Sequence, residues 1–116
     1  MKRFWQHVST RSLWSWQGCV DTWRAEYSFR AWVWANVASA ALAFLLPLSG
    51  VERALILALG VLVLAAELVN TAIEAAVDHT SMDTHPLAKR AKDAGSAGVA
   101  VTAIAAGVAW VFILIG

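Results

Sequence analysis

Three apolar segments dominate the pattern of hydrophobic and polar positions along the chain. The first segment spans residues 31–48 and the third spans residues 94–116. Neither contains a charged side chain. The second, residues 54–77, is apolar apart from a few polar positions. A helix needs about 20 apolar residues to cross the hydrocarbon core of a bilayer. The pattern therefore predicts three transmembrane helices, at residues 28–48, 52–80 and 87–116.

An amphipathic helix is predicted ahead of these segments, over residues 4–24. Leu13, Trp16, Val20 and Trp23 recur at spacings of three and four residues, which places them on one face of a helix. Most of the charged side chains of the segment fall outside that face. Because the segment is too polar to span a bilayer, we expect it to lie in the membrane interface, either shaping a lipid entrance or serving as a plain aromatic anchor.

The composition agrees with a membrane protein. Of the 116 residues, 59% are hydrophobic and only 15% are charged. A soluble domain of this length has too small a core to bury so much apolar surface. The net charge of +1 gives no reason to expect a nucleic-acid partner. We therefore expect an all-α membrane protein in which residues 1–116 form one domain, with a surface helix and three transmembrane helices.

Positive charges predict how the chain is oriented. Basic residues precede the first apolar segment and gather again between the second and the third, at Lys2, Arg3, Arg11, Arg24, Arg30, Lys89, Arg90 and Lys92. Because cytoplasmic loops carry an excess of lysine and arginine, we expect the N-terminus and the second loop to face the cytoplasm. Glycine and alanine are plentiful in the third segment, and small residues let membrane helices approach closely. We therefore expect a homo-oligomer.

The polar residues of the second apolar segment share one helical stripe. Glu67, Asn70, Thr71, Glu74 and Asp78 are spaced by three, one, three and four residues. Ionisable groups within a membrane span are costly and usually face a bundle interior or a polar cavity. Glu67 lies seven residues, about 10 Å, deeper than Glu74. The deep acid is thus a candidate general base for a lipid hydroxyl, and the outer acids can meet a hydrated cation or a nucleotide.

Two further residues bear on this carboxylate stripe. Glu26, between the surface helix and the first span, can join Glu74 around Mg²⁺, which needs only a few carboxylates plus substrate phosphates. Lys92 can meet nucleotide phosphates or anchor the chain to anionic lipids. The common nucleotide-binding motifs are absent from the sequence. The residues leave three interpretations open: an enzyme acting on a lipid, a proton or cation conduit, and a non-catalytic assembly subunit.

At these residues the sequence resembles the prokaryotic diacylglycerol kinase family of small trimeric membrane kinases. The matching positions are residues 67–78 (ELVNTAIEAAVD), His85, residues 91–97 (AKDAGSA), residues 15–18 (SWQG), Trp23, Glu26, Phe29 and Arg30. The resemblance implies transfer of the γ-phosphate of ATP to the hydroxyl of 1,2-diacylglycerol, with Mg²⁺, to give phosphatidic acid. It also implies a homotrimeric bundle in the bacterial inner (cytoplasmic) membrane, with sites built from neighbouring subunits.

The resemblance assigns site residues by position. Glu67 matches the general base, and Asn70 matches a polar residue that supports it. Glu26 and Glu74 match the acids that hold Mg²⁺ with the ATP phosphates. The positions that match nucleotide-binding residues are His7, Trp14, Asp83, Thr84, His85, Lys92 and Asp93. The positions that match residues near the lipid substrate are Trp16, Arg30 and Ser96, besides Glu67.

Three positions depart from the family pattern. Trp14 stands where tyrosine is usual, His7 where arginine is usual, and Trp32 where an acid is usual. These differences bear on nucleotide affinity rather than on the chemistry. The same scaffold also serves undecaprenol kinases: residues 85–89 (HPLAK) lean toward that group, whereas residues 95–97 (GSA) lean toward diacylglycerol kinases. Diacylglycerol is therefore the expected substrate, and a polyprenol is the alternative.

Overall fold

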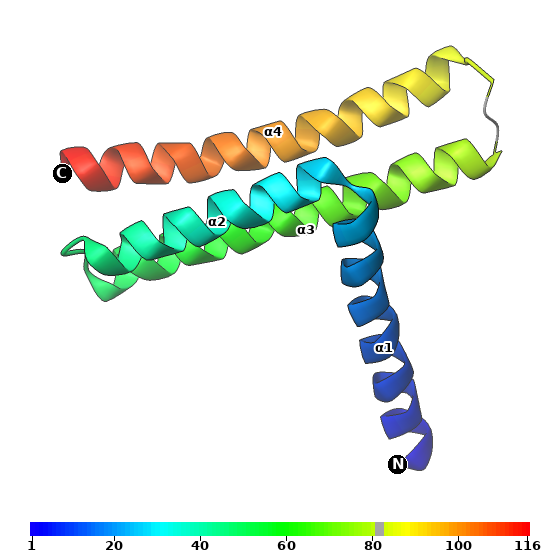
Figure 1. Cartoon of the computed structure of the whole chain (residues 1–116), viewed down its shortest axis with the longest axis horizontal. Coiled ribbons are helices and arrows are strands. Elements are labelled where there is room, and N and C mark those ends of the chain that lie inside the picture. The colour runs from blue at the N-terminus through cyan, green and yellow to red at the C-terminus, as the bar shows by residue number, and fades with distance from the viewer. Residues whose placement is uncertain (81–82) are drawn as a thin grey trace.

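The computed structural model describes residues 1–80 and 83–116, which are helical apart from short connections (Figure 1). Four helices follow one another along the chain: α1 (Lys2–Ala25), α2 (Tyr27–Leu45), α3 (Gly50–Thr80) and α4 (Pro86–Ile115). The prediction of an all-α chain, with one helix ahead of three apolar ones, is confirmed for these residues.

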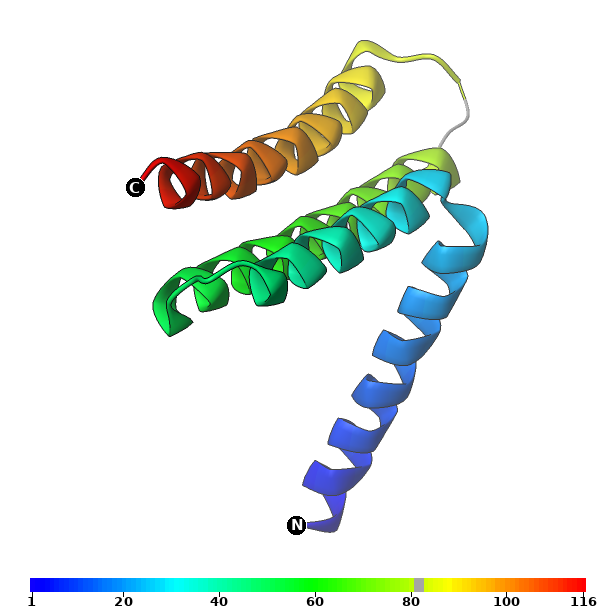
Figure 2. The same ribbon diagram turned by 60° about the vertical axis from the view of Figure 1, so that its left-hand side comes forward.

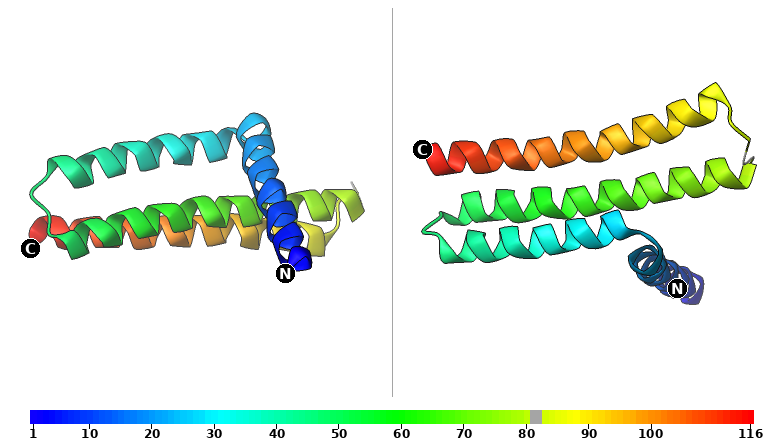
Figure 3. Two further views of the ribbon diagram at one scale, coloured as in Figure 1. Left: turned by 90° about the horizontal axis from the view of Figure 1, so that it is seen from below. Right: turned by 45° about the horizontal axis from the view of Figure 1, so that its top comes forward.

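Helix α3 is the centre of the arrangement. Helices α2 and α4 pack along different sides of it, and Trp110 Nε1 of α4 also donates to Ser39 Oγ of α2 at 2.9 Å, so the three form a bent layer with α3 at the bend (Figures 2 and 3). Both run antiparallel to α3, which places the α1–α2 corner, the end of α3 and the start of α4 at the same end of the layer (Figure 1). Helix α1 leaves this end at a steep angle to the layer and contacts α2 and α3.

A single residue separates α1 from α2. Glu26 is extended, with φ −113° and ψ 111°, so the chain turns between the two helices without glycine or proline. The Arg30 guanidinium reaches back from α2 and donates to the carbonyl oxygens of Trp23, at 2.5 Å, and Arg24, at 3.1 Å. The last carbonyls of a helix lack partners within it. Arg30 therefore satisfies the end of α1 and holds the corner in place.

Local chemistry also sets the turn from α2 to α3. Helix α2 ends at Leu45, earlier than predicted, because Pro47 disfavours helical backbone in the residue before it. Helix α3 begins at Gly50, also earlier than predicted, because two side chains cap it. The backbone N–H of Ser49 donates to Glu52 Oε1 at 2.8 Å, and the N–H of Glu52 donates to Ser49 Oγ at 3.1 Å. This reciprocal pair is a capping box.

Two asparagines fit into glycine notches on the neighbouring helix. The Asn36 side chain of α2 lies against Gly60 of α3, and the Asn70 side chain of α3 lies against Gly95 of α4. A methyl group on either glycine would overlap the asparagine Oδ1. Small residues of this kind let membrane helices approach closely enough to bury polar groups between them. Each helix contact in the layer therefore includes one polar side chain that depends on a glycine opposite.

Two helices are long and apolar enough to cross a membrane, α3 and α4. Large apolar side chains on α4, such as Val101, Ile104 and Phe112, are exposed, as expected of a helix that meets lipid or another membrane helix. Helix α2 is shorter, with 19 residues, and carries two tryptophans, Trp32 and Trp34. A membrane span is thus supported for α3 and α4, and the predicted first span stays a prediction.

We expect Gly95→Ala to loosen the contact between α3 and α4, because the new methyl group would displace the Asn70 side chain. Overpacking of this kind costs about 1–3 kcal/mol. Gly98→Ala is the matched control, since a Cβ on Gly98 meets nothing within 4 Å. Thermal unfolding in detergent micelles, followed by circular dichroism, should show a lower midpoint for Gly95→Ala alone. Equal midpoints for the two variants would show that the packing of Asn70 against Gly95 does not stabilise the protein.

Candidate active site

Glu67 is buried between α3 and α2. Its side chain is only 5% exposed, and Ser28 Oγ donates a long hydrogen bond of 3.5 Å to Oε2. The indole of Trp32, one turn further along α2, lies beside the same carboxylate. The carboxylates of Glu26 and Glu74 are near enough to repel it. Three acids therefore gather where α2 starts alongside α3.

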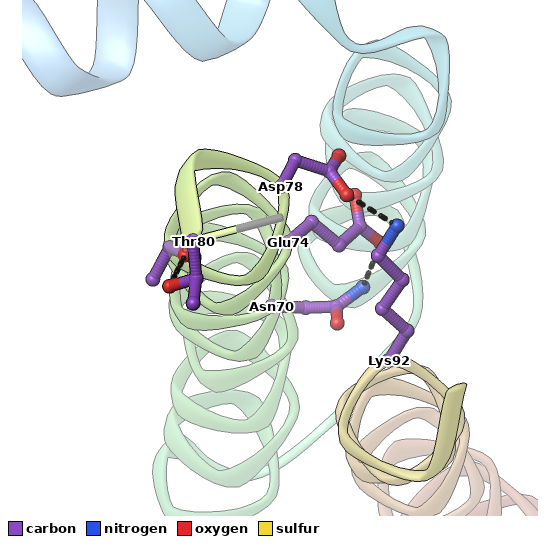
Figure 4. Close-up of polar contacts among 6 residues, drawn as sticks. Asn70, Glu74, Asp78, Thr80 and Lys92 are labelled. Carbon is purple, nitrogen blue, oxygen red and sulfur yellow. Dashed lines mark hydrogen bonds and ion pairs between the residues drawn. The ribbon is translucent and has the colours of Figure 1, made fainter. Parts of the chain in front are cut away.

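Asn70 faces α4 and connects it to the acids. The side-chain Nδ2 donates to Glu74 Oε1 at 3.1 Å (Figure 4). The Oδ1 atom lies against Gly95 and is buried without a hydrogen-bond partner among the described residues. An unpartnered buried acceptor is costly and rare, and such groups often belong to functional sites. Asn70 thus holds the Glu74 carboxylate through its Nδ2, while its Oδ1 stays unsatisfied against α4.

A lysine from α4 reaches the outer end of the carboxylate stripe. Nζ of Lys92 lies 2.5 Å from Oδ1 of Asp78, in an ion pair that joins α4 to α3. Figure 4 shows the Lys92 side chain running from α4 past Asn70 and Glu74 toward Asp78. The two side chains are 41% and 42% exposed. The Lys92 ammonium therefore lies at the water-accessible end of the carboxylate stripe, beyond Glu74.

A pocket of about 240 Å³ opens beside this ion pair, between the end of α3 and the start of α4. The residues that line it are Val77, Asp78, Asp83, Thr84, His85, Ala88, Lys89, Lys92 and Asp93. Asp93 pairs with Lys89 at 2.6 Å. The His85 Nδ1 accepts from the backbone N–H of Leu87 at 3.1 Å and so caps α4. The structure thus brings together the predicted nucleotide positions of this part of the chain.

The other predicted nucleotide positions lie on α1. His7 and Trp14 share a second concavity with Arg3, Gln6, Thr10 and Arg11. The guanidinium of Arg11 lies 6.0 Å from the Trp14 ring, a cation–π contact. Figures 1 and 2 show the N-terminal half of α1 pointing away from the connection between α3 and α4. A single chain therefore keeps His7 and Trp14 apart from Lys92.

The predicted lipid positions stay on separate helices in a single chain. Trp16 is exposed on α1, and Ser96 is exposed on α4. Arg30 is half-buried on α2, where its guanidinium is bound to the end of α1. The structure thus adds a structural contact for Arg30 to the role that the sequence suggested.

One residue beside the acids and one contact between predicted residues were missed by the sequence analysis. Ser28 lies within a largely apolar stretch and gives no periodic signal, and only its contact with Glu67 reveals it. The pairing of Asp78 with Lys92 joins two segments, and helical spacing within one segment cannot predict such a pair. Asp78 itself was found by the stripe, but without a partner.

The donor set suits a divalent cation. The carboxylates of Glu26 and Glu74, both near Glu67, are hard oxygen ligands, which Mg²⁺ prefers. Within residues 1–80 and 83–116, no cluster of three or more histidine, cysteine, aspartate or glutamate side chains is arranged to hold a metal. A cation held by these acids would therefore need oxygen atoms of a substrate to complete its shell.

Fold and site together define a small all-helical membrane protein with carboxylates at graded depths and a charged pocket at one end. The prokaryotic diacylglycerol kinase family matches residues 13–114. A diacylglycerol kinase of Pseudomonas aeruginosa is 46% identical over 99 residues, which cover 85% of this chain and 80% of the relative. A diacylglycerol kinase of Escherichia coli is 36% identical over 100 residues, which cover 86% and 82% of the two chains.

An undecaprenol kinase of Bacillus subtilis is also similar. It is 40% identical over 88 residues, which cover 76% of this chain and 72% of the relative. With nearly the whole chain matched, the protein belongs to the prokaryotic diacylglycerol kinase family. The resemblance seen in the sequence is confirmed.

Proposed function

We propose that this protein is an ATP-dependent diacylglycerol kinase, which phosphorylates the free hydroxyl of 1,2-diacylglycerol and so makes phosphatidic acid. The observation that carries the proposal is the order of side chains along α3. Buried Glu67 is followed by Asn70 bonded to Glu74, and then by the pair of Asp78 with Lys92. Membership of the kinase family favours an enzyme over the conduit and assembly interpretations.

The chain forms a single membrane domain with three spans, in α2, α3 and α4. Its N-terminus and the α3–α4 connection face the cytoplasm of the bacterial inner membrane, where ATP is available. The steep angle of α1 to the three-helix layer supports a helix lying on the membrane surface. The antiparallel course of α2 along α3 supports a third span, although α2 is the shortest of the three.

The working assembly is a homotrimer. The helices of one chain form a layer whose smallest extent is 23 Å, and much of its apolar surface is exposed. Predicted nucleotide positions lie both on α1, at His7 and Trp14, and at the α3–α4 pocket, at Lys92. One nucleotide can contact both sets only when α1 of a second subunit covers the pocket or when α1 moves. A composite site between subunits therefore explains why the two sets are apart in one chain.

The chemistry follows from the positions of these groups. The lipid hydroxyl loses its proton to Glu67 as its oxygen attacks the γ-phosphorus of ATP. A P–O bond forms to the lipid, the bond to the departing ADP breaks, and Glu67 then returns the proton to water. Asn70 keeps the Glu74 carboxylate in place, and Lys92 offsets charge on the phosphates. Phosphoryl transfer depends mainly on such positioning and neutralisation, which a site this small can supply.

Glu26 and Glu74 would hold Mg²⁺ together with the ATP phosphates. When bound, the cation neutralises phosphate charge and orients the γ-phosphate. Two carboxylates are enough for this role, because Mg²⁺ usually keeps several waters and binds substrate phosphates as well.

The lipid substrate is tested by supplying purified protein in mixed micelles with labelled ATP and Mg²⁺. Diacylglycerol and undecaprenol are offered side by side, since the chain has relatives with either name. We expect diacylglycerol to be phosphorylated much faster. Preferential labelling of undecaprenol would indicate an undecaprenol kinase instead. If neither alcohol is labelled, the proposed lipid kinase activity is wrong.

Glu67→Gln should lower kcat by about 10²- to 10⁴-fold, because the amide keeps the shape of the side chain but cannot take a proton. Equilibrium binding of ATP should change little, since Glu67 is the deepest of these acids. Glu52→Gln is the matched control on the same helix, because glutamine also closes a capping box. A Glu67→Gln variant as active as the control would sink the assignment of the base.

Glu74→Gln should instead weaken binding of ATP in the presence of Mg²⁺, by at least about tenfold. The amide lacks the charge that a divalent cation needs. Nucleotide titrations at several Mg²⁺ concentrations measure the effect, and the variant should need more Mg²⁺ to reach half-saturation. A binding curve that matches the unsubstituted protein at every Mg²⁺ concentration would remove Glu74 from the cation site.

A further inference from the structure

We propose that Asp78 is a positioning residue of the kinase reaction: it holds the Lys92 ammonium at the outer end of the carboxylate stripe, where the ammonium can meet the phosphates of an entering nucleotide. The inference rests on the proposed function of Lys92 and goes beyond it. The position of Asp78 on the carboxylate stripe suggested contact with a cation or a nucleotide, whereas the structure gives it a protein partner.

The first reason is the reach of the lysine. A lysine side chain is a flexible stem that carries a compact charge, so its Nζ can occupy many places unless something holds it. Lys92 projects from α4, whereas the acids it must serve lie on α3. The Asp78 carboxylate fixes Nζ at 2.5 Å, on the α3 side of the gap between the helices. Figure 4 shows the extended lysine on the side of α3 to which the Asn70 and Glu74 side chains also point.

The second reason is the spacing along α3. Asp78 follows Glu74 by four residues, or about one helical turn, so the two side chains lie on the same face. An ammonium held by Asp78 is therefore one turn outward of the carboxylate that Asn70 fixes. The same pair borders the pocket that contains Asp83, Thr84 and His85. A triphosphate entering this pocket would meet Lys92 at the pocket's inner side, toward the acids.

The third reason is that stability does not explain the pair. Both side chains are about two-fifths exposed, and ion pairs this accessible contribute little to folding. The pocket also holds the pair of Lys89 with Asp93, which lies within α4 and is more exposed. Of these two pairs, it is that of Lys92 with Asp78 that connects the two helices, so this pair can fix where the ammonium lies relative to the acids of α3.

Substitution separates positioning from simple attraction. Asp78→Asn removes a negative charge beside the nucleotide, so the Lys92 charge stays fully available and the KM for ATP should not rise. The ammonium, however, is no longer held in place, and kcat should fall by about tenfold or more. Asp78→Glu keeps the carboxylate and should recover part of the lost kcat. Asp21→Asn, on the exposed surface of α1, is the control and should leave both constants unchanged.

A double-variant comparison tests whether Asp78 acts through Lys92. When Asp78→Asn is combined with Lys92→Ala, it should lower kcat by less than twofold beyond Lys92→Ala alone. An equal loss in both backgrounds, an unchanged kcat in Asp78→Asn, or a rise in KM alone would overturn the positioning role. If Lys92→Ala itself keeps full activity, the proposed function of Lys92 fails, and that result differs from failure of the Asp78 inference alone. Equal thermal midpoints for Asp78→Asn and the unsubstituted protein exclude a folding defect.

Discussion

The burial of polar side chains between helices is the constraint on which this structure depends. Lipid offers no hydrogen-bond partners, so a polar group within a span has to be satisfied by a neighbouring helix. Glu67 and Asn70, both less than a tenth exposed, lie on two different sides of α3, and the Asn70 Oδ1 has no hydrogen-bond partner among the described residues. Glu67 turns to Ser28 of α2, and Asn70 lies in the Gly95 notch of α4. The functional side chains and the helix contacts of the layer are therefore the same groups.

This arrangement divides the site between two helix contacts. The deep acid belongs to the contact of α3 with α2, whereas the outer cation belongs to the contact of α3 with α4. The hydrogen bond from Asn70 to Glu74 runs along α3 and joins the two halves. A shift of α4 relative to α3 would thus move Lys92 and Gly95 while leaving Glu67, Asn70 and Glu74 in place. Catalysis that depends on positioning is sensitive to such shifts, because misplacement by about 1 Å can cost 10²-fold in rate.

The sequence predicted the elements well because their signals are local. Apolar runs, amphipathic spacing and the prolines at 47 and 86 give the order of the helices, and the stripe from Glu67 to Asp78 follows from helical periodicity. Contacts between segments carry no such signal. Nothing in the spacing indicates that Asn70 needs Gly95 opposite, or that Ser28 lies at Glu67. Resemblance to a family supplied the nucleotide positions, and the structure places them on two elements that one chain does not bring together.

The charges around the pocket link its geometry to a requirement for a divalent cation. Asp78 is paired with Lys92, and Asp93 with Lys89, so these four charges largely cancel within the protein. Glu26, Glu67 and Glu74 form a second group of acids, outside the pocket lining, where α2 starts alongside α3. A triphosphate is a multiply charged anion, and such acids alone would repel it. A divalent cation held between the carboxylates and the phosphates reverses that repulsion. A nucleotide that arrives with a divalent cation therefore suits these acids better than the nucleotide alone.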